Sequence, residues 1–182
     1  TKPDRGYEIG TLTSNPEKIK ITGPTSLINK IDKVNASIDV DGATEDITTE
    51  KDVKIIDKNG EEFTDSDMSY LNVSRVYVTA KLWKVQADVK IKAGYSGSPK
   101  SGYQVESVST TPNVVSVAGS EEGLATLKEQ NNTITIPDYV ADISDRDSDF
   151  EEKINISDYL PDGLKLTSDS SEDMFVRVNV LP

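Results

Sequence analysis

The residues best suited to bind a ligand form an acidic stretch at positions 142–152. Asp145, Asp147 and Asp149 alternate there with Arg and Ser, and hard cations such as Ca²⁺ favour clustered carboxylate oxygens. Counted from Asp145, an EF-hand loop requires Gly at its sixth position and Glu at its twelfth, which are Phe150 and Ile156 here. We therefore interpret the stretch as a solvated acidic loop and predict no metal site, keeping the three aspartates as candidate cation ligands.

Other side-chain chemistry is limited by composition. The sequence contains neither Cys nor His, which excludes Cys or Ser-His nucleophiles, Cys/His zinc sites and disulfides. Carboxylate pairs such as Asp39 and Asp41, or Glu61 and Glu62, do acid–base work only in a pocket that separates their pKa values. Asp41-Gly42 instead has the composition of a tight turn. We predict no catalytic residue, no cofactor and no enzymatic activity.

The charge of the chain argues against two classes of partner. The formal net charge is −12, and both halves of the sequence are acidic. This charge opposes the counterion release that drives binding to phosphate backbones, and it disfavours an anionic membrane surface. No apolar run approaches the roughly 18 residues of a membrane span, and residues 1–4 have no signal-peptide character. We expect no nucleic-acid partner and membrane attachment only through an anchor outside this chain.

The sequence contains an internal repeat. The phrase Pro-x-x-Gly-Tyr occurs at residues 3–7 and again at 99–103, an offset of 96 positions that continues without a gap for about 35 residues. The landmarks that coincide are Pro3, Gly6, Tyr7, Pro16 and Gly23 in the first copy and Pro99, Gly102, Tyr103, Pro112 and Gly119 in the second. We predict two tandem units, residues 1–82 and 83–182.

Within each copy the apolar residues alternate with polar ones, which predicts short β-strands closed by turns. The alternating segments are 19–21, 36–40, 53–55, 76–82, 85–91, 115–117, 134–136, 164–166 and 176–180. The exceptions are one short helix per copy, capped by Thr25 or Ser26 in the first and by Ser120 in the second. We predict a mainly β protein, each unit being a small antiparallel or mixed barrel-like unit or sandwich with one short helix.

The two copies differ at their beginning. The second copy opens with a strand at residues 85–93, whereas the first begins directly at its Pro-x-x-Gly-Tyr phrase. We expect the first unit to lack its opening strand and the chain to be a segment of a longer array. Because a missing strand leaves backbone N–H and C=O groups unpaired, this unit either borrows a strand from a neighbouring molecule or frays.

These phrases resemble the YbbR family over almost the whole chain. The family pattern has an opening strand, Gly-x-Pro-x-x-Gly-Tyr, Pro-x-x-Val-x-Val-x-Gly, a short helix and a Val-Asp-Leu-Ser-Gly-like strand end. Residues 97–103, 112–119 and 37–42 carry it here. Two departures occur: no proline precedes the closing strand near residues 70–73, and the second copy has Ile136-Pro137-Asp138 where the first has Val40-Asp41-Gly42.

The resemblance implies a mainly β domain that occurs in several copies on the extracytoplasmic face of the membrane of Gram-positive and related bacteria, held by an N-terminal helix. It also implies a membrane diadenylate cyclase, which makes cyclic di-AMP, as the partner that the protein regulates, and an unknown envelope ligand is a further possible partner. Composition alone supports a generic cell-surface binding or adhesive repeat as the alternative. A C-terminal cell-wall sorting signal in the full gene product would favour that alternative.

Three aromatic residues are predicted to pack rather than to bind ligands. Trp83 is the only tryptophan and lies where the two copies join, so we interpret it as a packing residue of the domain junction, with a partner-binding anchor as the alternative. Tyr7 and Tyr103 are expected to be core or strand-end residues. Replacing Tyr103 with Ala is predicted to cost about 3–5 kcal/mol, as for large aromatic residues in cores.

Overall fold

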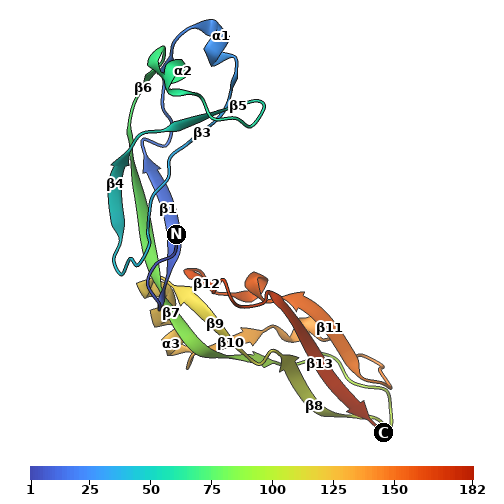
Figure 1. The fold of residues 1–182 in the computed structure, drawn as a ribbon. Helices are drawn as coiled ribbons and strands as arrows, with labels where there is room; N and C mark the ends of the chain where they lie inside the picture. The colour runs from blue at the N-terminus through green and yellow to red at the C-terminus, as the bar shows by residue number, and fades with distance from the viewer. The chain divides into compact units, whose positions relative to one another are not determined.

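The computed structural model describes residues 1–182 (Figure 1). The chain divides into two compact units, unit 1 at Thr1–Leu82 and unit 2 at Trp83–Pro182. Strands dominate both units, and several antiparallel sheets are present. The prediction of a mainly β protein is therefore confirmed. No helix is long and apolar enough to cross a membrane.

Unit 2 consists of two sheets. In the first, the order is β10 (Thr133–Ile136), β7 (Val76–Ala93, here from Lys84 onward), β9 (Val114–Gly119) and β12 (Leu164–Leu166). β10 pairs with β7 in parallel, and the other pairs are antiparallel. The second sheet has the order β11 (Phe150–Asn155), β13 (Asp173–Leu181) and β8 (Gln104–Thr111), all antiparallel. β7 is thus an inner strand of its sheet, hydrogen-bonded along both edges.

The two sheets of unit 2 enclose one apolar core. Alternate residues of each strand face inward, because successive side chains of a strand point to opposite faces. The fully or nearly buried residues come from both sheets: Val89, Ile91, Val115, Val117, Ile134, Ile136 and Leu164 from one, and Met174, Val176, Val178 and Val180 from the other. Unit 2 is therefore a closed β-sandwich.

The helix of unit 2 forms where the sequence predicts it. α3 (Glu121–Glu129) begins after Ser120, whose Oγ accepts a hydrogen bond from the backbone N–H of Gly123 at 3.1 Å. Glu121 lies in the first turn, where its charge is favourable relative to the helix dipole. Leu127 buries the inner face of the helix against the core. Two short 3₁₀ helices, η1 (Asp138–Val140) and η2 (Ile156–Tyr159), complete the unit.

Unit 1 has smaller sheets. β1 (Tyr7–Asn15) and β4 (Ile47–Lys51) both pair with β7, β4 along residues 76–80, and these strands lie side by side in Figure 1. Two two-stranded sheets accompany them: β2 (Ile21–Thr22) with β6 (Asn72–Val73), and β3 (Ile31–Asn35) with β5 (Lys54–Asp57). Val53, Val76 and Val78 form the buried cluster of this unit, and Val40, Ile55, Phe63 and Ala80 are buried outside it.

The first helix of unit 1 differs from its prediction. α1 (Thr25–Ile28) is a single turn whose N-cap is Pro24 and which has no side-chain cap, so the prediction that Thr25 or Ser26 caps it is wrong. Pro24 already has a φ of −58°, which suits the residue before a helix without a hydroxyl cap. The expected apolar stripe is also shorter than predicted, because Ile31 begins β3. Unit 1 adds a second helix, α2 (Asp65–Ser69), capped by Thr64.

Two strand predictions also need correction. Residues 76–82 and 85–91 form one uninterrupted strand, β7, and not two. Residues 36–40 form no strand, although they alternate in sequence as their counterparts in β10 do. The physical reason is that β10 pairs in the structure with residues 90–93 of β7, and unit 1 contains no equivalent of that partner.

Candidate functional site

A groove of about 790 Å³ opens into unit 1. Its lining mixes apolar and polar residues, and one part of it is β1, with Ile9 and Leu12. One wall is the segment around β2, with Ile19 and Ile21, and the opposite wall is the segment 35–40, with Ile38. The floor consists of the core residues Val53, Val76 and Val78.

The wall at residues 35–40 is held at its end by the N-terminal segment. The backbone N–H of Val40 donates to Oγ1 of Thr1 at 3.1 Å, and the N–H of Gly42 donates to the carbonyl of Lys2 at 2.9 Å. Gly42 adopts a φ of +66°, and the N–H of Asp41 donates to Oδ1 of Asp39, so this segment ends in a tight turn. That hydrogen bond lowers the pKa of the Asp39 carboxyl, because it stabilises the charged form.

The same positions are closed in unit 2. Four apolar positions of the groove have buried counterparts there, with the unit 1 residue first: Ile19 and Val115, Ile21 and Val117, Ile38 and Ile134, Val40 and Ile136. Of the four unit 1 residues, only Val40 is buried, whereas the other three are half-buried. In unit 2 the strand between these counterparts is β7, which pairs with β9 along one edge and with β10 along the other.

Of the candidate cation ligands Asp145, Asp147 and Asp149, the last two pair with different basic side chains, Lys100 and Arg177. Asp145 has a left-handed backbone with a φ of +57°, and its N–H donates to the carbonyl of Ser98. Oδ2 of Asp147 lies 3.5 Å from Nζ of Lys100. Within residues 1–182, no three His, Cys, Asp or Glu side chains gather so as to hold a metal ion.

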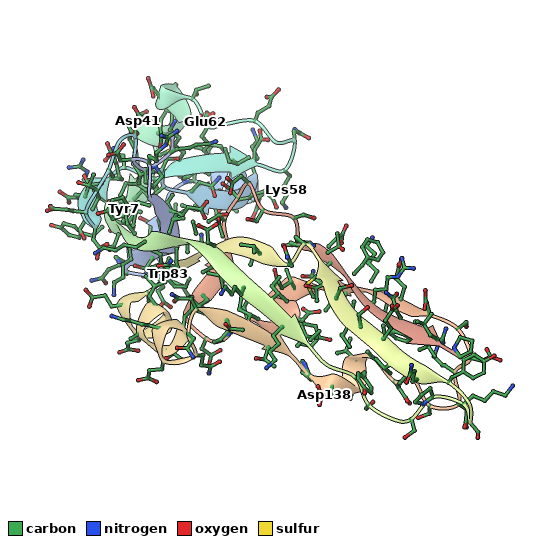
Figure 2. All side chains as sticks on the ribbon, turned by 90° about the horizontal axis from the view of Figure 1, so that it is seen from below. Tyr7, Asp41, Lys58, Glu62, Trp83 and Asp138 are labelled. Carbon is green, nitrogen blue, oxygen red and sulfur yellow. The ribbon has the colours of Figure 1, made fainter.

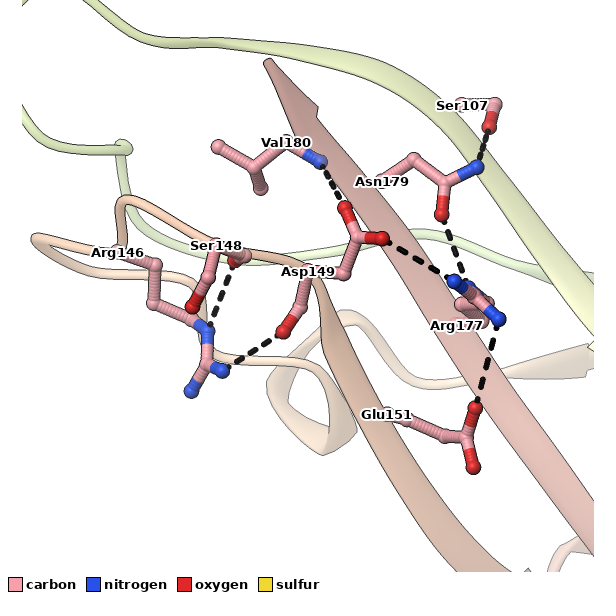
Figure 3. A network of polar contacts seen from close by, with 8 residues as sticks. All are labelled: Ser107, Arg146, Ser148, Asp149, Glu151, Arg177, Asn179 and Val180. Carbon is pink, nitrogen blue, oxygen red and sulfur yellow. Dashed lines mark hydrogen bonds and ion pairs between the residues drawn. The ribbon is translucent and has the colours of Figure 1, made fainter. Parts of the chain in front are cut away.

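Asp149 anchors a polar network on the outer face of the second sheet (Figure 3). Its Oδ1 accepts from the backbone N–H of Val180 at 2.8 Å, and its Oδ2 accepts from Arg177 at 3.1 Å. Arg177 also donates to Oδ1 of Asn179, whose amide donates to Oγ of Ser107. The bond from Val180 and the guanidinium of Arg177 together lower the pKa of the Asp149 carboxyl. The network therefore ties the start of β11 to β13 and β8.

The predicted aromatic residues are all half-buried. Trp83, labelled in Figure 2, has Nζ of Lys165 over its ring at 6.0 Å from the centroid. Tyr103 packs against the core of unit 2, and Tyr7 begins β1. Their proposed packing roles remain predictions.

The repeat landmarks occupy equivalent turns in the two units. Gly6 has a φ of +92° and Gly102 a φ of +91°, a left-handed conformation that glycine adopts readily. Each turn is closed by the backbone N–H of the following tyrosine, Tyr7 donating to Asp4 and Tyr103 to Lys100. The remaining landmarks lie as follows: Pro3 and Pro99 before these turns, Pro16 and Pro112 after β1 and β8, Gly23 after β2, and Gly119 at the end of β9.

Both repeats match one protein family, described as YbbR-like protein, at residues 1–80 and 88–180. The chain belongs to the YbbR-like family. It is also 30% identical over 182 residues to the CdaA regulatory protein CdaR of Bacillus subtilis (strain 168). The alignment covers 98% of this YbbR chain and 35% of CdaR, so the chain spans about a third of that relative's length. A YbbR-like protein from Streptococcus pneumoniae TIGR4, known from its crystal structure, is 17% identical with a TM-score of 0.36, covering 100% of this chain and 91% of the other.

The groove of this YbbR chain is the feature that sequence reasoning did not locate. The sequence predicts that residues 1–82 contain no counterpart of the strand at residues 85–93, but it does not show which residues line the groove. These residues can be located from the strand pairing in unit 2. The residues of unit 1 that match β9 and β10, the two partners of β7, lie along the groove.

Proposed function

We propose that this chain is a non-enzymatic binding and regulatory module on the outer face of a bacterial membrane, where it is part of a regulator of a membrane diadenylate cyclase. The observation that carries the proposal is the similarity to the CdaA regulatory protein CdaR, which extends over 98% of this chain. Membership of the YbbR-like family supports it. The membrane anchor of this regulator belongs to a part of the protein outside residues 1–182.

The chemistry of the described residues is compatible with this role. The chain has no His or Cys, and the aspartates of the acidic stretch include two that pair with basic side chains, Asp147 with Lys100 and Asp149 with Arg177. The net charge of −12 favours protein partners over nucleic acid. Regulation in this proposal acts through protein contacts and not through chemistry on the nucleotide.

The proposal is tested by a chimera. The part of CdaR that aligns with this chain is replaced by residues 1–182 in Bacillus subtilis, and cellular cyclic di-AMP is compared among wild type, chimera and a strain lacking CdaR. We expect the chimera to return the nucleotide level to within about twofold of wild type and to co-purify with CdaA, if the contacts with the cyclase lie in the part of CdaR that aligns with this chain. A matched chimera carrying Val117→Asp, which disrupts the core of unit 2, should neither restore the nucleotide level nor co-purify with CdaA.

A chimera that behaves like the deletion strain, although it is folded and present in the membrane, would contradict the regulatory role. The same result would favour a cell-surface binding or adhesive module.

A further inference from the structure

We propose that the groove of unit 1 binds one additional β-strand with the pattern of residues 85–93. This strand would be the continuation of the closing strand of a preceding copy of the unit in a longer polypeptide. The inserted strand would lie between the segment around β2 and residues 37–40. This would convert the open unit into a closed sandwich like unit 2.

The two walls of the groove identify the occupant as a strand. In unit 2, residues 114–119 pair antiparallel with β7, and residues 133–136 pair with it in parallel. The offset of 96 places these partners at residues 18–23 and 37–40, which line the groove of unit 1. A single strand inserted there meets an antiparallel neighbour on one side and a parallel one on the other, as β7 does.

The segments on either side of the groove have backbone edges that are free to form hydrogen bonds with such a strand. β2 is paired along one edge only, with β6, whereas its counterpart β9 is paired along both, with β12 and β7. Residues 36–40 form no strand at all. Strand addition to such an edge gains main-chain hydrogen bonds and is a recurring mode of recognition.

The side chains of the groove match the inward face of that strand. Val89 and Ile91 point from β7 into the core of unit 2, where their exposed fractions are 0% and 9%. In unit 1 the residues that would receive such side chains are Ile19, Ile21 and Ile38, and all three are half-buried. Burying the incoming apolar side chains therefore also removes the exposed area of the groove walls.

The course of β7 shows how a preceding copy could supply the additional strand. β7 closes unit 1 at residues 76–80, where it pairs with β4, and opens unit 2 from Lys84 onward without interruption. One strand thus belongs to two consecutive copies, and the same arrangement repeated once supplies unit 1. The relative CdaR is long enough for further copies, because this chain aligns with 35% of it. The inference stands apart from the cyclase proposal, since it concerns only folding of the repeats.

The test adds the missing strand to the whole chain. An extension with the sequence of residues 85–96 is placed directly before Thr1, which reproduces the spacing between strand and turn in unit 2. The control extension is identical except for Val89→Asn and Ile91→Asn within the added copy, leaving β7 unchanged. Amide hydrogen exchange at residues 18–23 and 37–40 is then measured in the unextended chain and in both extended chains.

We expect the native extension to slow exchange at both segments by about tenfold or more and the control extension to leave it unchanged, since exchange reports local opening of paired backbone. Equal exchange in all three proteins, or equal slowing by both extensions, would overturn the proposal. Sedimentation of the unextended chain then shows whether it is a monomer or a dimer. A dimer in which these segments are already protected would overturn it in favour of a second copy as the occupant.

Discussion

Units 1 and 2 are two copies of one repeat that differ in how completely their cores are buried. The turns at Gly6 and Gly102 have the same conformation, and corresponding strands follow both of them. Unit 2 buries fifteen apolar residues in one continuous core, whereas unit 1 buries seven, of which only Val53, Val76 and Val78 form a cluster. The matching apolar positions are present in both sequences, and in unit 2 the strand between two of the segments that carry them is β7. In our proposal, that one inner strand accounts for the difference.

The comparison also shows how a local sequence pattern depends on a distant partner. Residues 36–40 and 132–136 both alternate apolar and polar side chains, yet only the second segment becomes a strand, β10. The backbone of β10 pairs with residues 90–93 of β7. Because β-strand propensity reflects packing and pairing more than the backbone itself, the first segment forms no ladder.

The strongest test of this comparison removes the same side chain from both units. Ile134→Ala should lower the free energy of unfolding of unit 2 by about 2–5 kcal/mol, because Ile134 is 2% exposed in a closed core. Ile38→Ala, at the matching position, should cost about 1 kcal/mol or less, because its side chain is half-buried beside the groove. Amide exchange at residues 176–178 and at residues 76–78 gives the stability of each unit separately.

Equal losses for Ile134→Ala and Ile38→Ala would mean that the two cores are equally complete. In the protein extended with residues 85–96, the loss caused by Ile38→Ala should rise toward that of Ile134→Ala. That rise would connect the difference between the units to the missing strand.

The sequence predicted the fold class and most strands of the second copy, but it missed β11 (Phe150–Asn155), whose first residues belong to the stretch interpreted as a solvated acidic loop. Strict alternation predicted β9, β10, β12 and much of β13, and Ser120 with its following glutamates predicted α3. These elements agree because their local preference and their tertiary partners favour the same conformation. A helix with a hydroxyl cap and an acidic first turn needs little help from its surroundings.

The sequence failed where an element depends on a neighbour. The cap predicted at Thr25 or Ser26 is absent because Pro24 itself begins the turn of α1. Residues 76–82 and 85–91 were separated by a change of pattern at Trp83, but backbone pairing with β4 and then with β9 carries one strand through both. The groove was missed for the same reason, since its walls are defined by pairing and not by residue type.

A second comparison concerns the two landmark tyrosines. Tyr103 packs against the closed core of unit 2 but is half-buried, so Tyr103→Ala should cost about 2 kcal/mol, less than the 3–5 kcal/mol expected for full burial. Tyr7→Ala should cost about 1 kcal/mol, because the core of unit 1 is small. Denaturant melts of the two variants measure both values. A loss below about 1 kcal/mol for Tyr103→Ala would place that ring effectively on the surface.

A third comparison uses pH, because Asp149 stabilises unit 2 through a network on its second sheet. The folded-state pKa of Asp149 lies below its ordinary value of 3.8, first because of the Val180 N–H and then because of Arg177. The stabilisation is therefore present above about pH 4 and is lost as the pH falls through the lowered pKa. Asp149→Asn should lower the Tm of unit 2 at pH 7, and the difference from wild type should shrink toward pH 2.

Thermal melts at pH 7, 4 and 2 followed by circular dichroism check this dependence. The control is Asp147→Asn, whose exposed carboxylate makes only a 3.5 Å ion pair with Lys100 and should have little effect on Tm at any pH. A difference between Asp149→Asn and wild type that stays constant from pH 7 to pH 2 would show that the charge of Asp149 does not stabilise the sheet.

The smallest expected effect concerns Trp83, the first residue of unit 2. Nζ of Lys165, on β12, lies 6.0 Å from the centroid of its ring, at the outer limit of a cation–π contact. Lys165→Gln should therefore cost at most about 0.5 kcal/mol of stability, while the tryptophan fluorescence should shift because the charge next to the ring is removed. Lys92→Gln, an exposed position on β7, removes the same charge away from the ring and should leave the emission unchanged. If both variants shift the emission equally, the fluorescence responds to net charge and β12 does not hold a cation against Trp83. If only Lys165→Gln does so, the emission of Trp83 reports on the β9–β12 edge of unit 2, and unit 1, which contains no tryptophan, does not contribute to it.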